Sequence, residues 1–315
     1  MKLKAIFYAC CVLLVVQASA QEKSKYLIEG ENLVGKGKLK DAIKLYTKAV
    51  EEDDHNPVYF QKRGIAYAAS MQLNEAYDDF SKAIHLDNNF AEAYLCRAKV
   101  LTTVQRFEDA ISDLDMAIKY APNDSVRYEG FLARSGEKMS IRNFKGAFED
   151  SKLFYEYDSL SRDALMNMAM SKLELKEPEV ALEYLFRIIS LHPKDANALM
   201  NIGFVNLQTE HYDTALYYIH KAAELDPKNA YALCNEGYAK LKLGKTREAL
   251  ESVNASLKLN PENSYAYRNR ALIFIEMGNT EKACVDLQTA IKKDFTARYG
   301  DEVLDLIEKN CRKKK

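Results

Sequence analysis

The segment EALESVNASL, residues 248–257, recurs in altered form through most of the 315-residue chain. Its counterparts are DAIKLYTKAV (41–50), EAYDDFSKAI (75–84), DAISDLDMAI (109–118), GAFEDSKLFY (146–155), VALEYLFRII (180–189), TALYYIHKAA (214–223) and KACVDLQTAI (282–291). The aligned alanines are Ala42, Ala76, Ala110, Ala147, Ala181, Ala215, Ala249 and Ala283. They are 34 residues apart except between Ala110 and Ala147, which are 37 apart. Self-similarity at a fixed period of this length predicts an array of repeated units.

Other residue types recur in phase with these alanines. Twelve residues before each alanine stands a small residue: Gly30, Gly64, Ala98, Ser135, Ala169, Gly203, Gly237 or Ala271. Four residues after it, seven copies have a bulky side chain: Tyr46, Phe80, Leu114, Leu185, Ile219, Val253 and Leu287. Small residues let two helices approach closely, and bulky ones fill the space between them. Four copies end with a proline, where a helix should stop: Pro122, Pro193, Pro227 and Pro261.

This pattern resembles the tetratricopeptide repeat (TPR) family, with Lys23 as position 1 of the first repeat. The resemblance implies an all-α fold, a right-handed α-solenoid of eight 34-residue helix–turn–helix units with a C-terminal capping helix. The expected organisation is repeats 1–3 at 23–124, a divergent repeat 4 at 125–161, repeats 5–8 at 162–297, and a capping helix with a basic tail at 298–315. A terminal repeat exposes an apolar face that such a cap covers.

The wider spacing before repeat 4 puts three extra residues into the segment NDSVRYEG, residues 123–130. Three interpretations are open. The superhelix bends there, or repeats 1–3 and 5–8 act as two blocks around an adaptor, or the insertion is a tolerated loop.

Gly244-Lys245-Thr246, ahead of a helix-like run, looks like the end of a phosphate-binding loop. Such a loop would need a preceding strand and a glycine where Ala239 stands. Gly244 instead occupies position 15 of its repeat, as Gly37 and Gly278 do in theirs. The sequence therefore predicts a helix–turn–helix corner and no nucleotide site.

The first twenty residues have the character of a signal peptide. Lys2 and Lys4 precede an apolar run over residues 5–16, and Ala18-Ser19-Ala20 follows as a cleavage site. We expect cleavage after Ala20 and export of the chain, to the periplasm or outside the cell. No later segment is apolar enough to predict a transmembrane helix in the mature chain.

Charge and motifs argue against several function classes. The formal net charge is −1, whereas a nucleic-acid-binding protein normally has a basic face. The five histidines are scattered, and there is no H-E-x-x-H or C-x-x-C motif. We therefore predict no enzymatic activity, no catalytic residues, no metal, no cofactor, no small-molecule substrate and no nucleic-acid partner.

A column of asparagines marks a candidate binding face. Position 6 of repeats 5–8 is Asn167, Asn201, Asn235 and Asn269. A carboxamide can satisfy a peptide N–H and a peptide C=O together, so this column suits an extended peptide. The arrangement resembles the asparagine ladder in the TPR arm of O-GlcNAc transferase. The alternative is a structural role, in which the asparagines bond neighbouring helices.

Methionine and aromatic side chains, which suit adaptable recognition of apolar groups, are predicted to flank this column. They are Met170, Met200, Phe204, Tyr231, Tyr238 and Tyr265. The sequence thus favours a non-catalytic adaptor that binds other proteins or extended peptides in the concave groove of repeats 5–8. Two alternatives remain: a structural subunit of a cell-envelope or secretion assembly, and the TPR arm of an enzyme whose catalytic part lies in a partner.

Two cysteines near the C-terminus, Cys284 and Cys311, form a candidate disulfide. Cys284 begins the second helix of the last repeat, and Cys311 ends the cap expected to fold back on that helix. The chain resembles exported TPR proteins of Bacteroidota, which have one cysteine on the last repeat and another on the cap. An oxidising compartment would permit the bond. The alternative is a pair of buried thiols.

Overall fold

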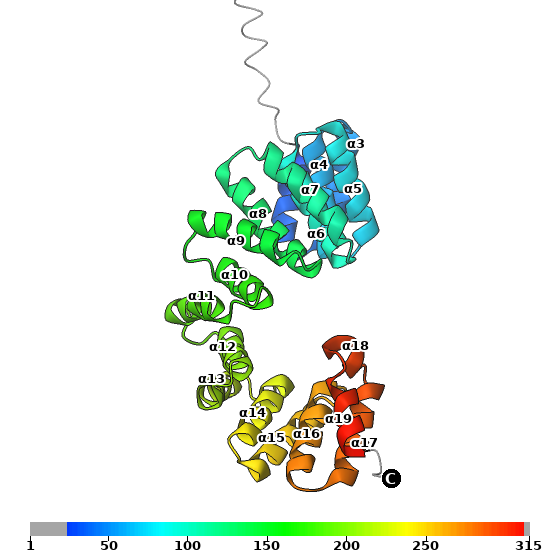
Figure 1. Cartoon of the computed structure of the whole chain (residues 1–315). Coiled ribbons are helices and arrows are strands. Elements are labelled where there is room, and N and C mark those ends of the chain that lie inside the picture. The colour runs from blue at the N-terminus through cyan, green and yellow to red at the C-terminus, as the bar shows by residue number, and fades with distance from the viewer. Residues whose placement is uncertain (1–23, 312–315) are drawn as a thin grey trace, which may run out of the picture. The chain divides into compact units, whose positions relative to one another are not determined.

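The computed structural model describes residues 24–311, so the predicted signal peptide (1–20) and basic tail (312–315) lie outside the described residues. Every regular element among residues 24–311 is a helix (Figure 1). The helices are α2 (Lys25–Gly35), α3 (Leu39–Glu52), α4 (Pro57–Ala69), α5 (Leu73–Leu86), α6 (Ala91–Thr103), α7 (Phe107–Tyr120), α8 (Asp124–Ser140), α9 (Phe144–Tyr157), α10 (Arg162–Glu174), α11 (Pro178–Leu191), α12 (Ala196–Gln208), α13 (Tyr212–Leu225), α14 (Ala230–Lys242), α15 (Thr246–Leu259), α16 (Ser264–Glu276), α17 (Thr280–Lys292), α18 (Phe295–Tyr299) and α19 (Glu302–Cys311). None of these helices is both long enough and apolar enough to cross a membrane.

The chain divides into two compact units, one ending at Tyr157 and the other beginning at Asp158. The first contains the helix pairs α2/α3, α4/α5, α6/α7 and α8/α9, which are repeats 1–4. The second contains α10/α11, α12/α13, α14/α15 and α16/α17, which are repeats 5–8, followed by α18 and α19. Within each unit successive helices stack side by side (Figure 1). The predicted fold of eight two-helix repeats is confirmed.

Close packing explains the small residues of the repeat. All eight aligned alanines, from Ala42 to Ala283, are 0% exposed. A Cβ atom added to Gly237 would lie 2.4 Å from Cγ2 of Val253 and 3.0 Å from the carbonyl oxygen of Ala249. The backbones of α14 and α15 approach so closely that only a small residue fits between them. The periodic pattern therefore records the contact between the two helices of each repeat.

The corner between the two helices of every repeat has a left-handed residue. Position 15 has a φ between 60° and 75° in all eight copies, which are Gly37, Met71, Gln105, Arg142, Lys176, Glu210, Gly244 and Gly278. Gly244 follows α14 and precedes α15, so the GKT segment is a helix–turn–helix corner, as predicted. Five of the eight corners use a residue with a side chain, although this conformation favours glycine.

Gln105→Gly is therefore expected to raise the free energy of unfolding of the first unit by about 0.5–1 kcal/mol. Glycine removes the free-energy cost of the left-handed conformation. This gain is larger than the stability lost because glycine raises the conformational entropy of the unfolded chain. Urea unfolding followed by circular dichroism measures the change. Gln105→Ala, which keeps the strain, is the matched control. An equal response of the two variants would contradict the explanation.

Four repeats contain an arginine–aspartate clamp, in which an arginine of the first helix binds an aspartate of the second helix through two hydrogen bonds. The pairs are Arg63–Asp79, Arg97–Asp113, Arg134–Asp150 and Arg270–Asp286. Each arginine also donates a third hydrogen bond to the preceding repeat, to Thr47, Ser81, Asp115 or Asn254. One guanidinium thus joins three helices, a role to which its planar fork of donors is suited.

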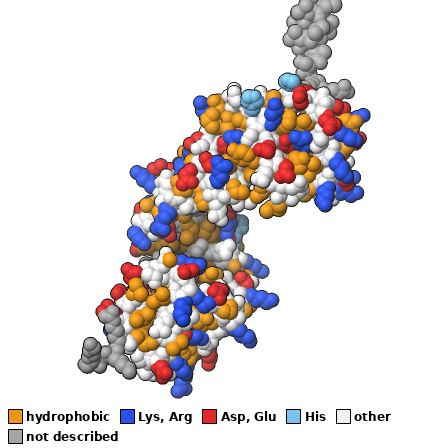
Figure 2. All heavy atoms as spheres, turned by 90° about the vertical axis from the view of Figure 1, so that its right-hand side faces the viewer, with side chains coloured by type: hydrophobic (Ala, Val, Ile, Leu, Met, Phe, Trp, Pro, Cys, Tyr) orange, Lys and Arg blue, Asp and Glu red, His pale blue; other side chains and the backbone are white. Residues whose placement is uncertain are grey.

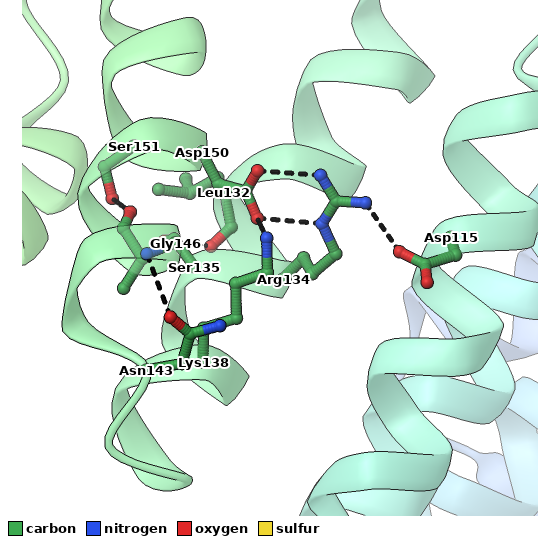
Figure 3. Close-up of polar contacts among 10 residues, drawn as sticks. Asp115, Leu132, Arg134, Ser135, Lys138, Asn143, Gly146, Asp150 and Ser151 are labelled. Carbon is green, nitrogen blue, oxygen red and sulfur yellow. Dashed lines mark hydrogen bonds and ion pairs between the residues drawn. The ribbon is translucent and has the colours of Figure 1, made fainter.

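The clamp of repeat 4 is the most elaborate. Nε and Nη2 of Arg134 lie 2.8 and 2.7 Å from the carboxylate of Asp150, and Nη1 binds Asp115 (Figure 3). Nζ of Lys138 lies 2.8 Å from the same Asp150 carboxylate. The Asp150 side chain is only 3% exposed, so two cations balance a buried anion.

The three-residue insertion lies at the start of α8. This helix has 17 residues, whereas α4, α6 and α10 have 13. The side chain of Asn123 caps it by accepting a hydrogen bond from the backbone N–H of Val126. The interpretation as a loop insertion was wrong, because helical capping and backbone hydrogen bonds let the inserted residues add a turn to the helix. Repeat 4 belongs to the same compact unit as repeats 1–3.

The end of the second unit is covered by α18 and α19. Phe295 and Val303 are 0% exposed and pack on Leu287 and Ala290 of α17. The cap begins at Phe295, three residues earlier than expected, because Asp294 adopts a left-handed φ of 62° and breaks the helix there. Burial of these side chains fixes α19 beside α17 (Figure 1).

Candidate functional site

A cavity of about 350 Å³ opens on the face formed by the first helices of repeats 6–8. We call it the aromatic pocket. Its lining residues are Phe204 and Gln208 from α12, Tyr231, Cys234 and Asn235 from α14, Tyr265 from α16, Tyr299 from α18 and Glu302 from α19. The volume lies within the range of about 300–1,000 Å³ typical of ligand pockets. Three repeats and the cap together build one site.

Four aromatic rings give the pocket its character. The Tyr265 ring stacks on Phe295 at 5.8 Å between centroids and meets the Tyr299 ring edge-on at 5.2 Å. Tyr231 and Tyr299 are 58% and 50% exposed, so their rings are open to a ligand. A rigid aromatic surface supplies contact area with little loss of side-chain entropy.

A second cavity of about 240 Å³ adjoins the aromatic pocket and shares four of its lining residues. Its complete lining is Phe204, Leu207, Gln208, Glu210, Tyr212, Asn235, Tyr238 and Tyr265. Together the two cavities follow the first helices of repeats 6–8. This continuity gives a path along which an extended segment could lie.

A part-buried ion pair attaches the cap to the wall of the pocket. Arg268, 6% exposed, donates hydrogen bonds from Nε and Nη2 to the two carboxylate oxygens of Glu302. Its guanidinium also lies over the rings of Tyr238 and Tyr265, at 5.0 and 5.3 Å from their centroids. Arg268 therefore holds Glu302 of α19 against α16 and positions the rim of the pocket.

The asparagine column joins successive repeats in a regular way. Nδ2 of Asn201 lies 3.4 Å from Sδ of Met166, and Nδ2 of Asn235 lies 3.8 Å from Sδ of Met200. In both pairs a position-6 asparagine donates toward the position-5 sulfur of the preceding repeat. This contact is the structural role considered as the alternative. Among residues 24–311, nothing donates to Oδ1 of Asn201 or Asn235, so both carbonyls remain as acceptors.

Asn269 does not face the pocket, contrary to its expected place in a peptide ladder. It is 0% exposed, and its Nδ2 donates to the carbonyl oxygen and Sγ of Cys234. Its Oδ1 accepts a hydrogen bond from Nη1 of Arg268. The reason is the arginine at position 5 of repeat 8, which together with the cap closes the space above Asn269.

Five of the predicted residues come together around the two cavities: Phe204, Tyr231, Asn235, Tyr238 and Tyr265. Four others are half-buried and line neither cavity, namely Asn167, Met170, Met200 and Asn201. Sequence reasoning missed Gln208, Arg268, Tyr299 and Glu302. Gln208 and Arg268 lie within repeats, so the repeat pattern could have placed them on this face. Tyr299 and Glu302 belong to the cap, where the repeat pattern does not indicate which face a side chain occupies.

The thiol of Cys234 lies at the base of the pocket. Burial raises the pKa of this thiol to about 12, so it stays protonated at neutral pH. A nucleophilic cysteine needs a depressed pKa and an adjacent base. Cys234 is therefore a packing residue.

Two neighbouring asparagines of the column are expected to respond differently to mutation. Asn269→Ala should lower the free energy of unfolding of the second unit by about 1–3 kcal/mol, because buried partners lose hydrogen bonds. Asn235→Ala should change it by less than about 1 kcal/mol, because a long sulfur contact at a half-buried site is all that is lost. Thermal and urea unfolding of both variants measure the difference. Equal destabilisation would show that the whole column is structural.

The face drawn in Figure 2 carries lysines, arginines, aspartates and glutamates intermingled with hydrophobic side chains. No extended area of one charge sign dominates it. Recognition on this face would thus depend on local pockets more than on a long-range field.

Comparison with known proteins identifies the repeat. The family model for the tetratricopeptide repeat matches residues 166–230 and 234–295. The small glutamine-rich tetratricopeptide repeat-containing protein 2 of Mycosarcoma maydis is 31% identical over 106 residues, which are 34% of this chain and 30% of that protein. The DnaJ homolog subfamily C member 3 of Bos taurus is 27% identical over 156 residues, 49% of this chain and 31% of that protein. The chain thus spans less than a third of the length of these relatives.

A third relative is an enzyme, serine/threonine-protein phosphatase 5 of Rattus norvegicus, 32% identical over 84 residues. The match covers 27% of this chain and 17% of the phosphatase.

Solved structures share the fold at low identity. The C-terminal part of a TPR repeat-containing protein from Cytophaga hutchinsonii has a TM-score of 0.61 and 16% identity, over 77% of this chain and 98% of that one. The chain matched in the APC/C hetero-tetramer Cut9–Hcn1 has a TM-score of 0.62 and 17% identity, over 92% of this chain and 57% of that one. A tetratricopeptide repeat protein from Parabacteroides merdae has a TM-score of 0.51 and 15% identity, over 93% of this chain and 100% of that one.

Proposed function

Because this chain is a tetratricopeptide repeat protein, and such proteins generally mediate protein–protein interactions, we propose that it is a non-catalytic adaptor. It binds an extended segment of a partner protein on the first-helix face of repeats 6–8. This narrows the site expected from the sequence, because the residues that line the two cavities come from repeats 6–8 and the cap, and none comes from repeat 5. The observation that carries the proposal is the aromatic pocket, in which three repeats and the cap converge.

The chemistry of the pocket suits an extended polypeptide. Oδ1 of Asn235 is available to accept a backbone N–H, and Gln208 adds a second carboxamide in the wall. The rings of Phe204, Tyr231 and Tyr299 offer apolar contact to side chains. Affinity would come from many small contacts along the stacked helices, as in other repeat arrays.

We propose further that the protein acts outside the cytoplasm, after cleavage of residues 1–20. The structure places Cys284 and Cys311 as a disulfide pair, with 5.7 Å between their Cα atoms, and this pairing supports the proposal. Such a bond persists in an oxidising compartment such as the periplasm or the extracellular space. It would lock the cap, and with it Tyr299 and Glu302, in place.

A crosslinked pulldown from the native envelope tests the adaptor proposal. The bait proteins are the wild type, a Tyr231→Ala/Asn235→Ala variant, and a Tyr217→Ala control. Tyr217 is 53% exposed, much like Tyr231, but lies on the second helix of repeat 6. We expect specific partners with wild type and control and their loss from the double variant at unchanged melting temperature. Unchanged partners in all three would overturn the proposed site and favour a structural subunit.

A further inference from the structure

The charged side chains that line the two cavities have one sign. Glu302 is the charged residue in the lining of the aromatic pocket, and Glu210 is the charged residue in the lining of the adjoining cavity. The side chain of Glu302 is 45% exposed, so its carboxylate reaches solvent at the rim. Two hydrogen bonds from Arg268 leave further lone pairs on that carboxylate for a ligand.

The rings in this wall already bind cations of the chain itself. Arg268 lies over Tyr238 and Tyr265, and Nζ of Lys242 lies 5.5 Å from the centroid of Tyr238. The negative face of an aromatic ring attracts a cation within about 6 Å. Tyr238 and Tyr265, which line the two cavities, thus already have cationic partners within the chain.

The remaining rings are open. Within residues 24–311, no lysine or arginine lies over Phe204, Tyr231 or Tyr299, although all three line the pocket. An aromatic enclosure with a carboxylate at its rim matches the stem and the charge of a long cationic side chain. Arg268 does not make the pocket select an acidic side chain instead, because its N–H donors already bind Glu302 and Asn269.

We propose that the aromatic pocket selects a lysine or arginine side chain of the bound segment. The inference rests on the proposed function, since it assigns the side chain that an extended peptide places there. The aliphatic stem packs between Tyr231 and Phe204, the cationic group lies on the open rings, and Glu302 accepts a hydrogen bond from it.

Panning a phage-displayed library of random peptides against the purified oxidised chain tests this preference. Selected peptides are then synthesised with a fluorescent label, and their affinities are measured by anisotropy for the wild type, Tyr231→Ala and Tyr217→Ala. In a matched peptide series the selected lysine or arginine is replaced by norleucine, which keeps the apolar stem and removes the charge. We expect basic residues to be enriched among the selected peptides. Replacement by norleucine should weaken the affinity of a peptide about tenfold or more. Tyr231→Ala should weaken the affinity to a similar extent, and Tyr217→Ala should not.

The outcomes separate the two proposals. Peptides that depend on Tyr231 but tolerate norleucine would overturn the cationic preference and leave the binding site intact. Peptides that bind wild type, Tyr231→Ala and Tyr217→Ala equally, or an absence of selected peptides, would overturn both. Glutamate-rich consensus peptides that depend on Tyr231 would also overturn the preference, since they would reveal an acidic ligand.

Discussion

Asp150→Ala is expected to lower the free energy of unfolding of the first unit by about 3–5 kcal/mol. The carboxylate is 3% exposed and binds Arg134 through two hydrogen bonds. It is also the partner of Lys138, whose side chain is 18% exposed. Removal of the carboxylate leaves two largely buried cations without their shared anion. The free-energy cost of these uncompensated charges exceeds the stability that the intact ion pair contributes.

Urea unfolding measures the loss, and hydrogen exchange followed by mass spectrometry should place it in α8 and α9. Asp115→Ala is the matched control, because Asp115 binds the same Arg134 but is 54% exposed. An exposed pair is worth about 0–1 kcal/mol. If both variants lost the same small amount, the clamp would not be a stabilising element of the repeat.

Loss of the Cys284–Cys311 bond is the second large effect. The two cysteines are separated by 27 residues in the sequence. Restriction of a loop of that length in the unfolded chain stabilises the fold by about 3.5 kcal/mol on the chain-entropy estimate, within a usual range of about 2–4 kcal/mol. Cys284→Ser with Cys311→Ser should lower the free energy of unfolding of the second unit by that amount. Reduction of the wild type should do the same.

The double variant is the control for reduction, because Cys96 and Cys234 are free and a reductant should not change its stability. Intact mass under non-reducing conditions, with a thiol-alkylating reagent added after denaturation, counts the oxidised cysteines directly. Four alkylated thiols in the chain purified from an oxidising compartment would contradict the disulfide and, with it, the locked cap.

The helix pairs were predictable because their constraints are local and repeated. In every copy an alanine such as Ala249 follows a small residue such as Gly237 by twelve positions, so the same helix contact leaves the same sequence pattern eight times. The left-handed corner is less visible, since five copies place residues such as Gln105 or Glu210 there. Their backbones are fixed by the two helices on either side, which over-determine the turn.

The arginine–aspartate clamps had a sequence signal. Arg63 and Asp79 are 16 residues apart, as are the partners of the other three clamps. Repeats 5 and 6 lack this pair, having Met168 with Tyr184 and Ile202 with Tyr218 at the same positions. A search for paired charges at a fixed phase would have found the clamps.

The pocket was only half predictable. Phe204, Tyr231 and Asn235 follow from the phase of the repeat, which places them on one face. Tyr299 and Glu302 lie beyond the last repeat, and their positions depend on where the chain reverses after Asp294 and Gly300, both of which have positive φ. The burial of Asn269 likewise depends on the cap, a contact that no repeat position specifies.

The most direct test of the adaptor account is site-specific photo-crosslinking in the native envelope. A photoreactive benzoylphenylalanine replaces Tyr231 in one protein and Tyr217 in another, because the two side chains are 58% and 53% exposed and differ mainly in the face they occupy. The account predicts discrete adducts with a partner protein at position 231, competed by a peptide selected for the pocket, and none of these at position 217. Adducts at 217 alone, or equal adducts at both, would contradict it.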